Sequence, residues 1–218
     1  MFYYDIHTHQ QTNHPEEISI FSFDVRNPFT PDNRLSYAFG VHPWYINADD
    51  PDTANRLLSC VGELAILSEA VAIGETGLDK VTAKTSADFQ LQQSLFVSHA
   101  RLSEELKKPL IIHCVKAYND ILRFHNSIKP AMPWIIHGFR GKEALASQLL
   151  HAGFYLSFGR YYDRGALKAA WANHRLLVET DDCQINIRDI YHLVANDLNI
   201  PEFEISDSMQ VFRRFCPA

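Results

Sequence analysis

Apolar residues along this chain follow two alternating patterns. Short, nearly continuous apolar runs, typical of strands buried on both faces, occupy residues 70–74, 110–112, 133–136, 154–158 and 176–178. Segments in which apolar residues recur with the period of a helix occupy residues 86–107, 117–127, 142–152, 164–173, 187–198 and 203–215. Because the two patterns alternate, they predict parallel strands joined by helices.

The first third of the chain is less regular. Residues 3–9, 18–25 and 35–41 are strand-like, and the first helical pattern, over residues 52–70, follows all three. Since no helix fits between these first strands, and about eight strands are expected in all, we predict an α/β fold of the TIM-like (β/α) barrel type, trimmed in its N-terminal third. The lack of an obvious linker or internal repeat favours a single domain over residues 1–218.

Composition narrows the class of protein. The chain has 218 residues, 46% of them hydrophobic and 21% charged, as in ordinary globular domains. Its formal net charge of −6 argues against coating nucleic acid by bulk electrostatics, but not against a nuclease whose bound metals supply positive charge. Its four widely spaced cysteines suit reduced thiols. We expect a cytoplasmic protein with no leader peptide and no membrane span.

Polar side chains that can bind metal follow the strand-like runs. Four imidazoles and two carboxylates stand at these positions: His7, His9, Glu75, His113, His137 and Asp181. A single histidine or acid at a strand end is more often a capping or loop residue. The strands of a parallel barrel, however, all end on one face, where barrel enzymes build their active sites. Six such residues at matching positions therefore favour a metal site, and the i, i+2 spacing of His7 and His9 lets both rings reach one ion.

These residues belong to an ordered series of motifs. The series is Asp5-Ile6-His7-Thr8-His9, Gly40-Val41-His42-Pro43, Ala72-Ile73-Gly74-Glu75-Thr76-Gly77-Leu78-Asp79, Pro109-Leu110-Ile111-Ile112-His113, Ile135-Ile136-His137-Gly138-Phe139 and Glu179-Thr180-Asp181. It resembles the motif series of the TatD family, which comprises metal-dependent deoxyribonucleases within the amidohydrolase-like barrels. The resemblance extends from about residue 3 to residue 182, and its most specific element is the Gly-Glu-Thr-Gly-Leu-Asp run.

The resemblance implies a site for two divalent ions, Mg²⁺, Mn²⁺ or Zn²⁺. One ion would be held by His7, His9, Glu75 and Asp181, and the other by Glu75, His113 and His137. Glu75 would bridge the ions, and Asp181 would position the attacking water and take its proton. Two divalent cations against two carboxylates leave a net positive pocket, which suits a phosphodiester better than a neutral amide.

Other residues are candidates for contacts with the substrate. We expect His42 to contact a phosphate or a base, with a turn histidine before Pro43 as the alternative. Lys116 is expected to contact phosphate, and so are Arg140 and Lys142, with a solvated charged loop as the alternative for these last two. Stacking on nucleobases is open to Trp44, Tyr45, Tyr161 and Tyr162, with an ordinary place in the core or at the rim as the alternative. Asp79 is expected to orient a metal ligand. Cys114 should point away from the site, and the remaining histidines are expected to have no part in the chemistry: His14, His99, His125, His151, His174 and His192.

The chain departs from the family pattern around the substrate. The family usually has an arginine and an acid after the third motif histidine, where this chain has Lys116, and often has a further histidine where this chain has Trp44. The segments after His9 and after Asp181 are also shorter than usual. The metal ligands are complete, so these departures alter the contacts with the substrate rather than the hydrolysis.

The predicted function is that of a metal-dependent deoxyribonuclease, 3'-5' exonuclease-like, acting without an obligate protein partner. One alternative is a deaminase or amidase of the amidohydrolase type on the same barrel. Many such enzymes bridge their metals with a carboxylated lysine, whereas the corresponding strand here delivers Glu75. The other alternative is a homologue that binds metal without catalysis.

Overall fold

The structure, a computed structural model, describes residues 1–11 and 14–209, and the chain falls into two compact units. The first unit comprises Met1–Phe21 and Ile135–Ala218, and the second comprises Ser22–Trp134. The expectation of a single domain over the whole chain stays a prediction.

The described residues contain eight strands: β1 (Tyr3–Thr8), β2 (Glu17–Asp24), β3 (Ser36–Gly40), β4 (Ala70–Asp79), β5 (Leu110–Val115), β6 (Trp134–Ile136), β7 (Tyr155–Phe158) and β8 (Leu176–Val178). In the first unit β1 pairs with β2, and β7 lies between β6 and β8, all parallel. A parallel bridge from Thr8 to Asp181 links the end of β1 to the chain just after β8. In the second unit β4 lies between β3 and β5, again parallel.

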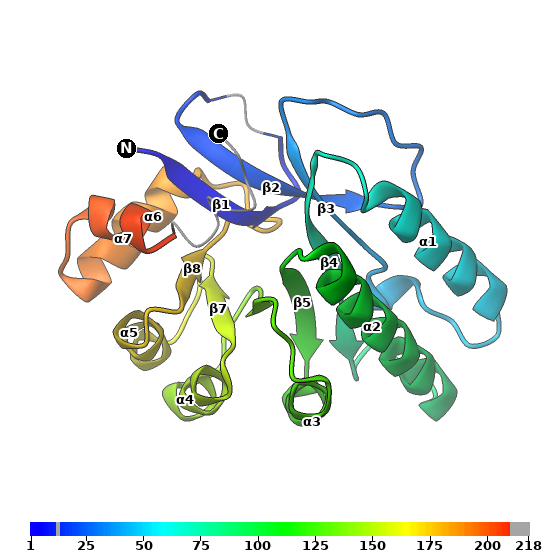
Figure 1. The fold of residues 1–218 in the computed structure, drawn as a ribbon. Coiled ribbons are helices and arrows are strands. Elements are labelled where there is room, and N and C mark those ends of the chain that lie inside the picture. Colours follow the sequence, from blue (N-terminus) through cyan, green and yellow to red (C-terminus); the bar gives the residue numbers. More distant parts are fainter. Residues whose placement is uncertain (12–13, 210–218) are drawn as a thin grey trace. The chain divides into compact units, whose positions relative to one another are not determined.

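Helices follow the strands from β3 onward: η1 (Pro43–Tyr45), α1 (Pro51–Leu64), α2 (Ser86–Leu106), α3 (Tyr118–Ile128), α4 (Glu143–Ala152), α5 (Arg164–Ala172), α6 (Ile187–Leu198) and α7 (Glu202–Ser208). Figure 1 shows α1 and α2 beside β3 and β4 in the second unit, and α4 and α5 beside β7 in the first. Within the described residues no helix joins β1, β2 and β3, as predicted. Residues 210–215 of the predicted last helix lie outside the described residues.

The helices begin where their sequences supply capping groups. The hydroxyl of Thr85 accepts from the N–H of Asp88, and the carboxylate of Asp88 accepts from the N–H of Thr85, which closes a capping box at the start of α2. Asp163 caps α5 and Asn186 caps α6 through their side-chain oxygens. None of the helices in the described ranges is long and apolar enough to cross a membrane.

Two strands and one helix differ most from their predicted bounds. We predicted that β4 and β5 end at residues 74 and 112, but β4 continues to Asp79 and β5 to Val115, because the two strands stay paired beyond their apolar runs. Glu75 and His113 therefore lie inside strands. We also predicted that α1 reaches residue 70, but it ends at Leu64, because the ammonium of Lys108 bonds the carbonyl oxygens of Ala65 and Leu67 and holds the chain in a turn.

Gly77 permits the close pairing of β4 and β5. It has φ +157° and lies opposite His113, and a Cβ at this position would stand 1.9 Å from the carbonyl oxygen of His113. Gly77→Ala is therefore expected to lower the free energy of unfolding by at least about 3 kcal/mol.

Gly62 provides the matched control, because it lies in α1 with nothing within 4 Å of a Cβ at its position. Gly62→Ala is expected to raise the free energy of unfolding by about 0.5–1 kcal/mol. Urea unfolding of both variants measures the contrast. Equal stability of the two variants would contradict the close approach of β4 and β5.

His99 is a buried neutral imidazole that braces the second unit. Its ring lies in α2 with no exposure, and Nε2 accepts from the N–H of Val41 at 3.0 Å. The proton therefore resides on Nδ1, which donates to the carbonyl oxygen of Leu95 at 2.7 Å. Burial lowers the pKa of His99 from 6.5 to about 4. The ring acts as a structural link, in keeping with the expectation that it takes no part in the chemistry.

This lowered pKa predicts an acid-sensitive stability. The unfolded chain binds a proton at His99 below pH 6.5 while the folded chain does not until about pH 4, so stability falls as pH drops between these values. From pH 7.5 to 5.0 the loss due to His99 is about 2 kcal/mol. His99→Gln should remove that part of the pH dependence in urea unfolding. A variant that loses stability with acid as steeply as the wild type would refute this role.

Candidate metal centre

The first unit brings together three of the predicted ligands. His7 is in β1, His137 directly follows β6, and Asp181 lies just beyond β8, so all three are at the carboxyl ends of parallel strands. One ligand atom from each lies within 4.8 Å of the other two. The Nε2 atom of His7 is 3.6 Å from Oδ1 of Asp181, and Nε2 of His9 is 3.8 Å from the same oxygen.

These separations suit ligands that share an ion. Donors at the usual metal bond lengths in a tetrahedral site are about 3.4 Å apart, close to the 3.6 and 3.8 Å between Asp181 and the two histidines. The rings of His7 and His137 lie 4.2 Å apart between centroids, and His7 has no exposed surface. A set of imidazoles and a carboxylate, converging from three strand ends, fits a divalent ion such as Zn²⁺, Mn²⁺ or Mg²⁺.

The backbone holds Asp181 in place from both sides. Its N–H donates to the carbonyl oxygen of His7 at 2.9 Å, and its carbonyl oxygen accepts from the N–H of His9 at 3.1 Å. Asp181 has φ +55°, a conformation that non-glycine residues adopt rarely and mostly at turns and functional sites. The carboxylate is thus aimed at the two histidines by bonds that fix its own main chain.

A buried network of hydrogen bonds holds the loop that carries Asp181. Asp5 is 1% exposed, and its carboxylate accepts from the N–H of Thr180 at 3.0 Å and from the Thr180 hydroxyl at 2.6 Å. The same hydroxyl lies 2.8 Å from Oγ1 of Thr8. Burial raises the pKa of Asp5 to about 7, against the opposing effect of the Thr180 hydrogen bonds. Asp5 therefore locks β1 to the loop that carries Asp181, a role the sequence analysis did not assign.

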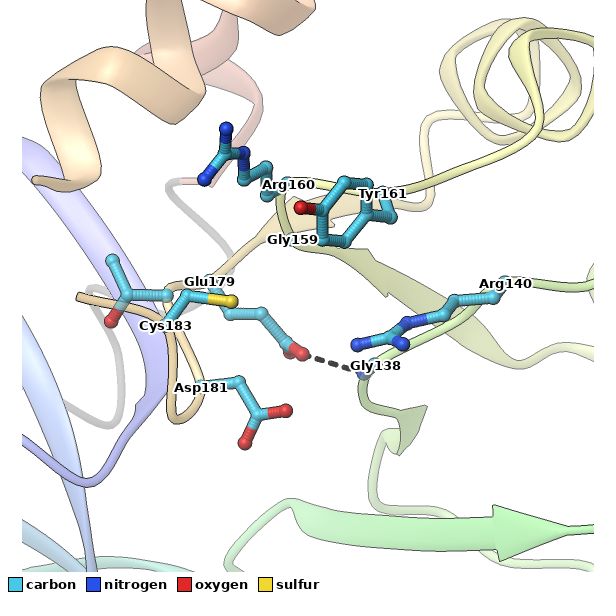
Figure 2. Close-up of a pocket in the computed structure, with 9 residues that line it drawn as sticks. Gly138, Arg140, Gly159, Arg160, Tyr161, Glu179, Asp181 and Cys183 are labelled. Carbon is cyan, nitrogen blue, oxygen red and sulfur yellow. Dashed lines mark hydrogen bonds between the residues drawn. The ribbon is translucent and has the colours of Figure 1, made fainter. Parts of the chain in front are cut away.

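Glu179 is a second residue whose role was missed. Its side chain is fully buried, and Oε1 accepts from the N–H of Gly138 at 2.6 Å (Figure 2). The same oxygen lies 3.5 Å from Nδ1 of His137. Burial raises the pKa of Glu179. The hydrogen bond and charge of His137 and the charge of His7 lower this pKa by more, so the net shift is downward. A carboxylate that contacts a ligand histidine orients its ring. The available signal was an acid directly after an apolar strand.

The second unit brings together another cluster, formed by His42, Glu75 and His113. Oε1 of Glu75 lies 3.0 Å from Nε2 of His42 and 3.0 Å from Nδ1 of His113, and these two nitrogens are 3.3 Å apart. Such separations match neighbouring ligands of an octahedral ion, about 3.0 Å apart. We expected His42 to contact the substrate, and the structure makes it a candidate ligand as well.

Asp79 lies beside the same cluster. Its Oδ2 is 3.3 Å from Nε2 of His113 and accepts from the indole N–H of Trp44 at 2.8 Å, while its own N–H donates to Gln92 at 2.9 Å. Burial raises the pKa of Asp79, but the hydrogen bonds from Trp44 and from the N–H groups of the following turn outweigh it and leave the pKa below its usual range. Asp79 stands where a carboxylate can orient the His113 ring.

The predicted substrate contacts are less gathered. Arg140 lines a recess beside Asp181. Lys142 stands at the N-cap position of α4 and its side chain is exposed, and Lys116 is exposed after β5. Cys114 is buried, and burial raises its pKa to about 12, as expected for a thiol that points into the wall.

The four aromatic residues considered for stacking differ in their exposure and contacts. Trp44 and Tyr161 are 62% and 58% exposed. Tyr45 has the guanidinium of Arg26 over its ring at 3.5 Å, and the hydroxyl of Tyr162 donates to Asp197 at 3.0 Å. Trp44 and Tyr161 therefore keep an open ring surface.

Residues 29–189 match the family described as TatD related DNase. Among curated proteins, the chain is 35% identical over 157 residues to the uncharacterized metal-dependent hydrolase YcfH of Escherichia coli K12, which covers 68% of this chain and 56% of YcfH. It is 30% identical over 172 residues to the 3'-5' ssDNA/RNA exonuclease TatD of Citrobacter rodentium, which covers 75% of this chain and 63% of that protein. The chain thus spans less than two thirds of the length of these relatives.

Solved structures resemble the whole chain. The Escherichia coli TatD homologue YJJV matches with a TM-score of 0.74 at 18% identity, over 98% of this chain and 97% of that one. A TatD family hydrolase from Entamoeba histolytica matches with a TM-score of 0.73 at 16% identity, over 100% of this chain and 99% of that one. With the eight parallel strands, this likeness confirms the predicted fold class, a (β/α) barrel. The match to three quarters of its length places the chain in the TatD related DNase family.

Proposed function

We propose that this protein is a metal-dependent hydrolase that cleaves phosphodiester bonds in DNA, working inward from the 3' end. The observation that carries the proposal is the convergence of His7, His137 and Asp181 within 4.8 Å at the ends of three strands. The names of curated relatives support it, since one group is called metal-dependent hydrolase and another 3'-5' ssDNA/RNA exonuclease. We also propose that the protein works in the cytoplasm without an obligate protein partner.

The proposed metal ligands are the six that the sequence analysis singled out: His7, His9, Glu75, His113, His137 and Asp181. The first unit supplies His7, His9, His137 and Asp181, and the second supplies Glu75 and His113. That two ions are held, with Glu75 shared between them, is part of the proposal. His42 joins the set because its Nε2 lies as close to Glu75 as the ring of His113 does.

Bound divalent ions would supply Lewis-acid stabilisation of the phosphate charge and make a bound water more acidic. Asp181 would orient the attacking water and accept its proton, and the bonds from its main chain to His7 and His9 hold the residue in place. Glu179 holds the His137 ring by its Nδ1 edge, and Asp79 lies beside Nε2 of His113. Arg140, which lines the recess beside Asp181, would bind phosphate oxygens of the substrate.

The experiment uses the full chain, freed of metal, and a single-stranded oligonucleotide labelled at its 5' end. Addition of Mg²⁺, Mn²⁺ or Zn²⁺ should produce a ladder of products shortened from the 3' end, and chelation should stop it. If no metal supports cleavage of DNA or RNA while an amide or a lactone is hydrolysed, the proposal is wrong and the amidohydrolase alternative holds.

A further inference from the structure

A shallow recess opens beside Asp181 in the first unit. The loops after β6, β7 and β8 form it, with the lining residues Gly138, Arg140, Gly159, Arg160, Tyr161, Glu179, Thr180, Asp181 and Cys183. In the view of Figure 2 the ring of Tyr161 lies between the side chains of Arg160 and Arg140, and Asp181 lies below them. Two cations and an aromatic ring thus surround the mouth of the site that holds the proposed general base.

The charges of the two arginines are available to a ligand. Among the residues that the structure describes, neither Arg140 nor Arg160 has a carboxylate within ion-pair distance. Five other arginines are paired with acids in this way, namely Arg26, Arg34, Arg123, Arg164 and Arg188. The exposed Arg56 and Arg101 have no such pair within the described residues either, but they stand singly on α1 and α2. The protein has a formal net charge of −6, so two such guanidinium groups in one recess make a local concentration of positive charge. Their donor forks match the geometry of a phosphate.

The Tyr161 ring is held beside these cations and faces solvent. The guanidinium carbon of Arg160 lies 5.4 Å from the ring centroid and that of Arg140 lies 5.9 Å from it, both within cation–π range. Tyr161 is 58% exposed, whereas the hydroxyl of its neighbour Tyr162 is engaged by Asp197. An exposed aromatic ring with two phosphate-binding groups beside it has the composition of a stacking site for a nucleobase.

We propose that Arg140, Tyr161 and Arg160 form the subsite for the unpaired nucleotide next to the bond that is cut. The guanidinium groups bind its phosphate, and the ring of Tyr161 stacks on its base. A base inside a duplex has no free face to offer, so this subsite selects single-stranded ends. The inference rests on the proposed function, since it takes Asp181 as the place of cleavage. It adds the residues that bind the phosphate and the base of the single strand.

Binding of a fluorescein-labelled single-stranded DNA 12-mer to the full chain in the presence of a chelator tests the subsite without turnover. Fluorescence anisotropy should give a Kd about tenfold higher for Tyr161→Ala and an unchanged Kd for Tyr161→Phe, which keeps the stacking face. Arg160→Ala should weaken binding and lower the slope of log Kd against log salt by about 0.7, the share of one phosphate contact. Lys168→Ala, which removes an exposed cation on α5, is the control and should leave Kd unchanged.

A 12-mer that lacks its 3'-terminal base distinguishes the contribution of the base to binding from that of the phosphate. The wild type should bind this abasic strand about tenfold more weakly than the intact one, and Tyr161→Ala should bind both alike. Equal Kd values for wild type, Tyr161→Ala and Arg160→Ala would overturn the subsite, and so would tight binding of a blunt duplex or no binding of the 12-mer at all.

The metal-dependent assay distinguishes failure of the subsite from failure of the proposed function. If the wild type cuts DNA and Tyr161→Ala cuts it with the same KM and kcat, the subsite is wrong and the proposed function stands. If no metal supports cleavage but Tyr161→Ala and Arg160→Ala still weaken DNA binding, the proposed function is wrong, and the three residues remain a binding site for single strands that is not tied to cleavage. A raised KM with kcat little changed in Tyr161→Ala supports both.

Discussion

Asp181→Asn should lower the kcat of DNA cleavage by about 10³-fold, since removal of a general base typically costs 10²–10⁴-fold. An amide oxygen cannot take the proton of the attacking water, and it offers an ion no negative charge. The main-chain bonds from Asp181 to His7 and His9 do not involve the carboxylate, so the loop and the fold should persist. Circular dichroism and urea unfolding should therefore match the wild type within about 1 kcal/mol.

Asp182→Asn is the matched control. Asp182 is the exposed neighbour of Asp181, and its neutralisation makes the same change in net charge one residue away. Its kcat should stay within about twofold of the wild type, since exposed substitutions away from a site are usually near neutral. Loss of activity in both variants alike would point to bulk charge instead of a specific base, and full activity in Asp181→Asn would remove Asp181 from the mechanism.

Glu75→Gln is the second substitution for which we expect a large loss. Oε1 of Glu75 lies 3.0 Å from a nitrogen of each of two histidines, and the side chain is 6% exposed, so it is the anionic centre of the cluster in the second unit. A neutral amide would leave His42 and His113 without that charge. We expect a loss of about 10³-fold in kcat and a fall of about 10–100-fold in metal affinity.

Metal affinity is measured directly by calorimetric titration of the metal-free protein with Mn²⁺, a readout that does not depend on activity. Glu63→Gln, an exposed position on α1, is the control with the same change of charge. If Glu75→Gln bound Mn²⁺ as tightly as the wild type, Glu75 would not be a ligand. The His42–Glu75–His113 cluster would then be a hydrogen-bonded network.

The sequence predicted the fold well where local pattern decides it. The bounds of α6 and β8 agree with prediction because an amphipathic repeat with a good cap, and a fully apolar run, each decide the structure locally. The end of β4 was predicted wrongly because it depends on pairing with β5 across Gly77, a contact between distant parts of the chain. The end of α1 was predicted wrongly for the same kind of reason, since it depends on Lys108.

The site shows the same division. His7, His137 and Asp181 could be predicted as a group because strand ends in a parallel barrel share one face. The position of Glu179 directly after an apolar strand was a usable signal, but its contacts could not be predicted, since they depend on the direction of the Gly138 N–H. The place of His42 beside Glu75 likewise follows from the path of the chain after β3, for which the sequence has only a turn signal before Pro43.

The link between Asp5 and Thr180 joins residues that are 175 positions apart. A ribosome makes β1 well before the segment after β8. Asp5 can bond Thr180, and the carbonyl oxygen of Asp181 can accept from the N–H of His9, only after that later segment has been made. Contacts with so long a separation form late in folding, because the long loop between them must close first. A nascent chain that ends before β8 therefore cannot assemble the His7–His137–Asp181 cluster.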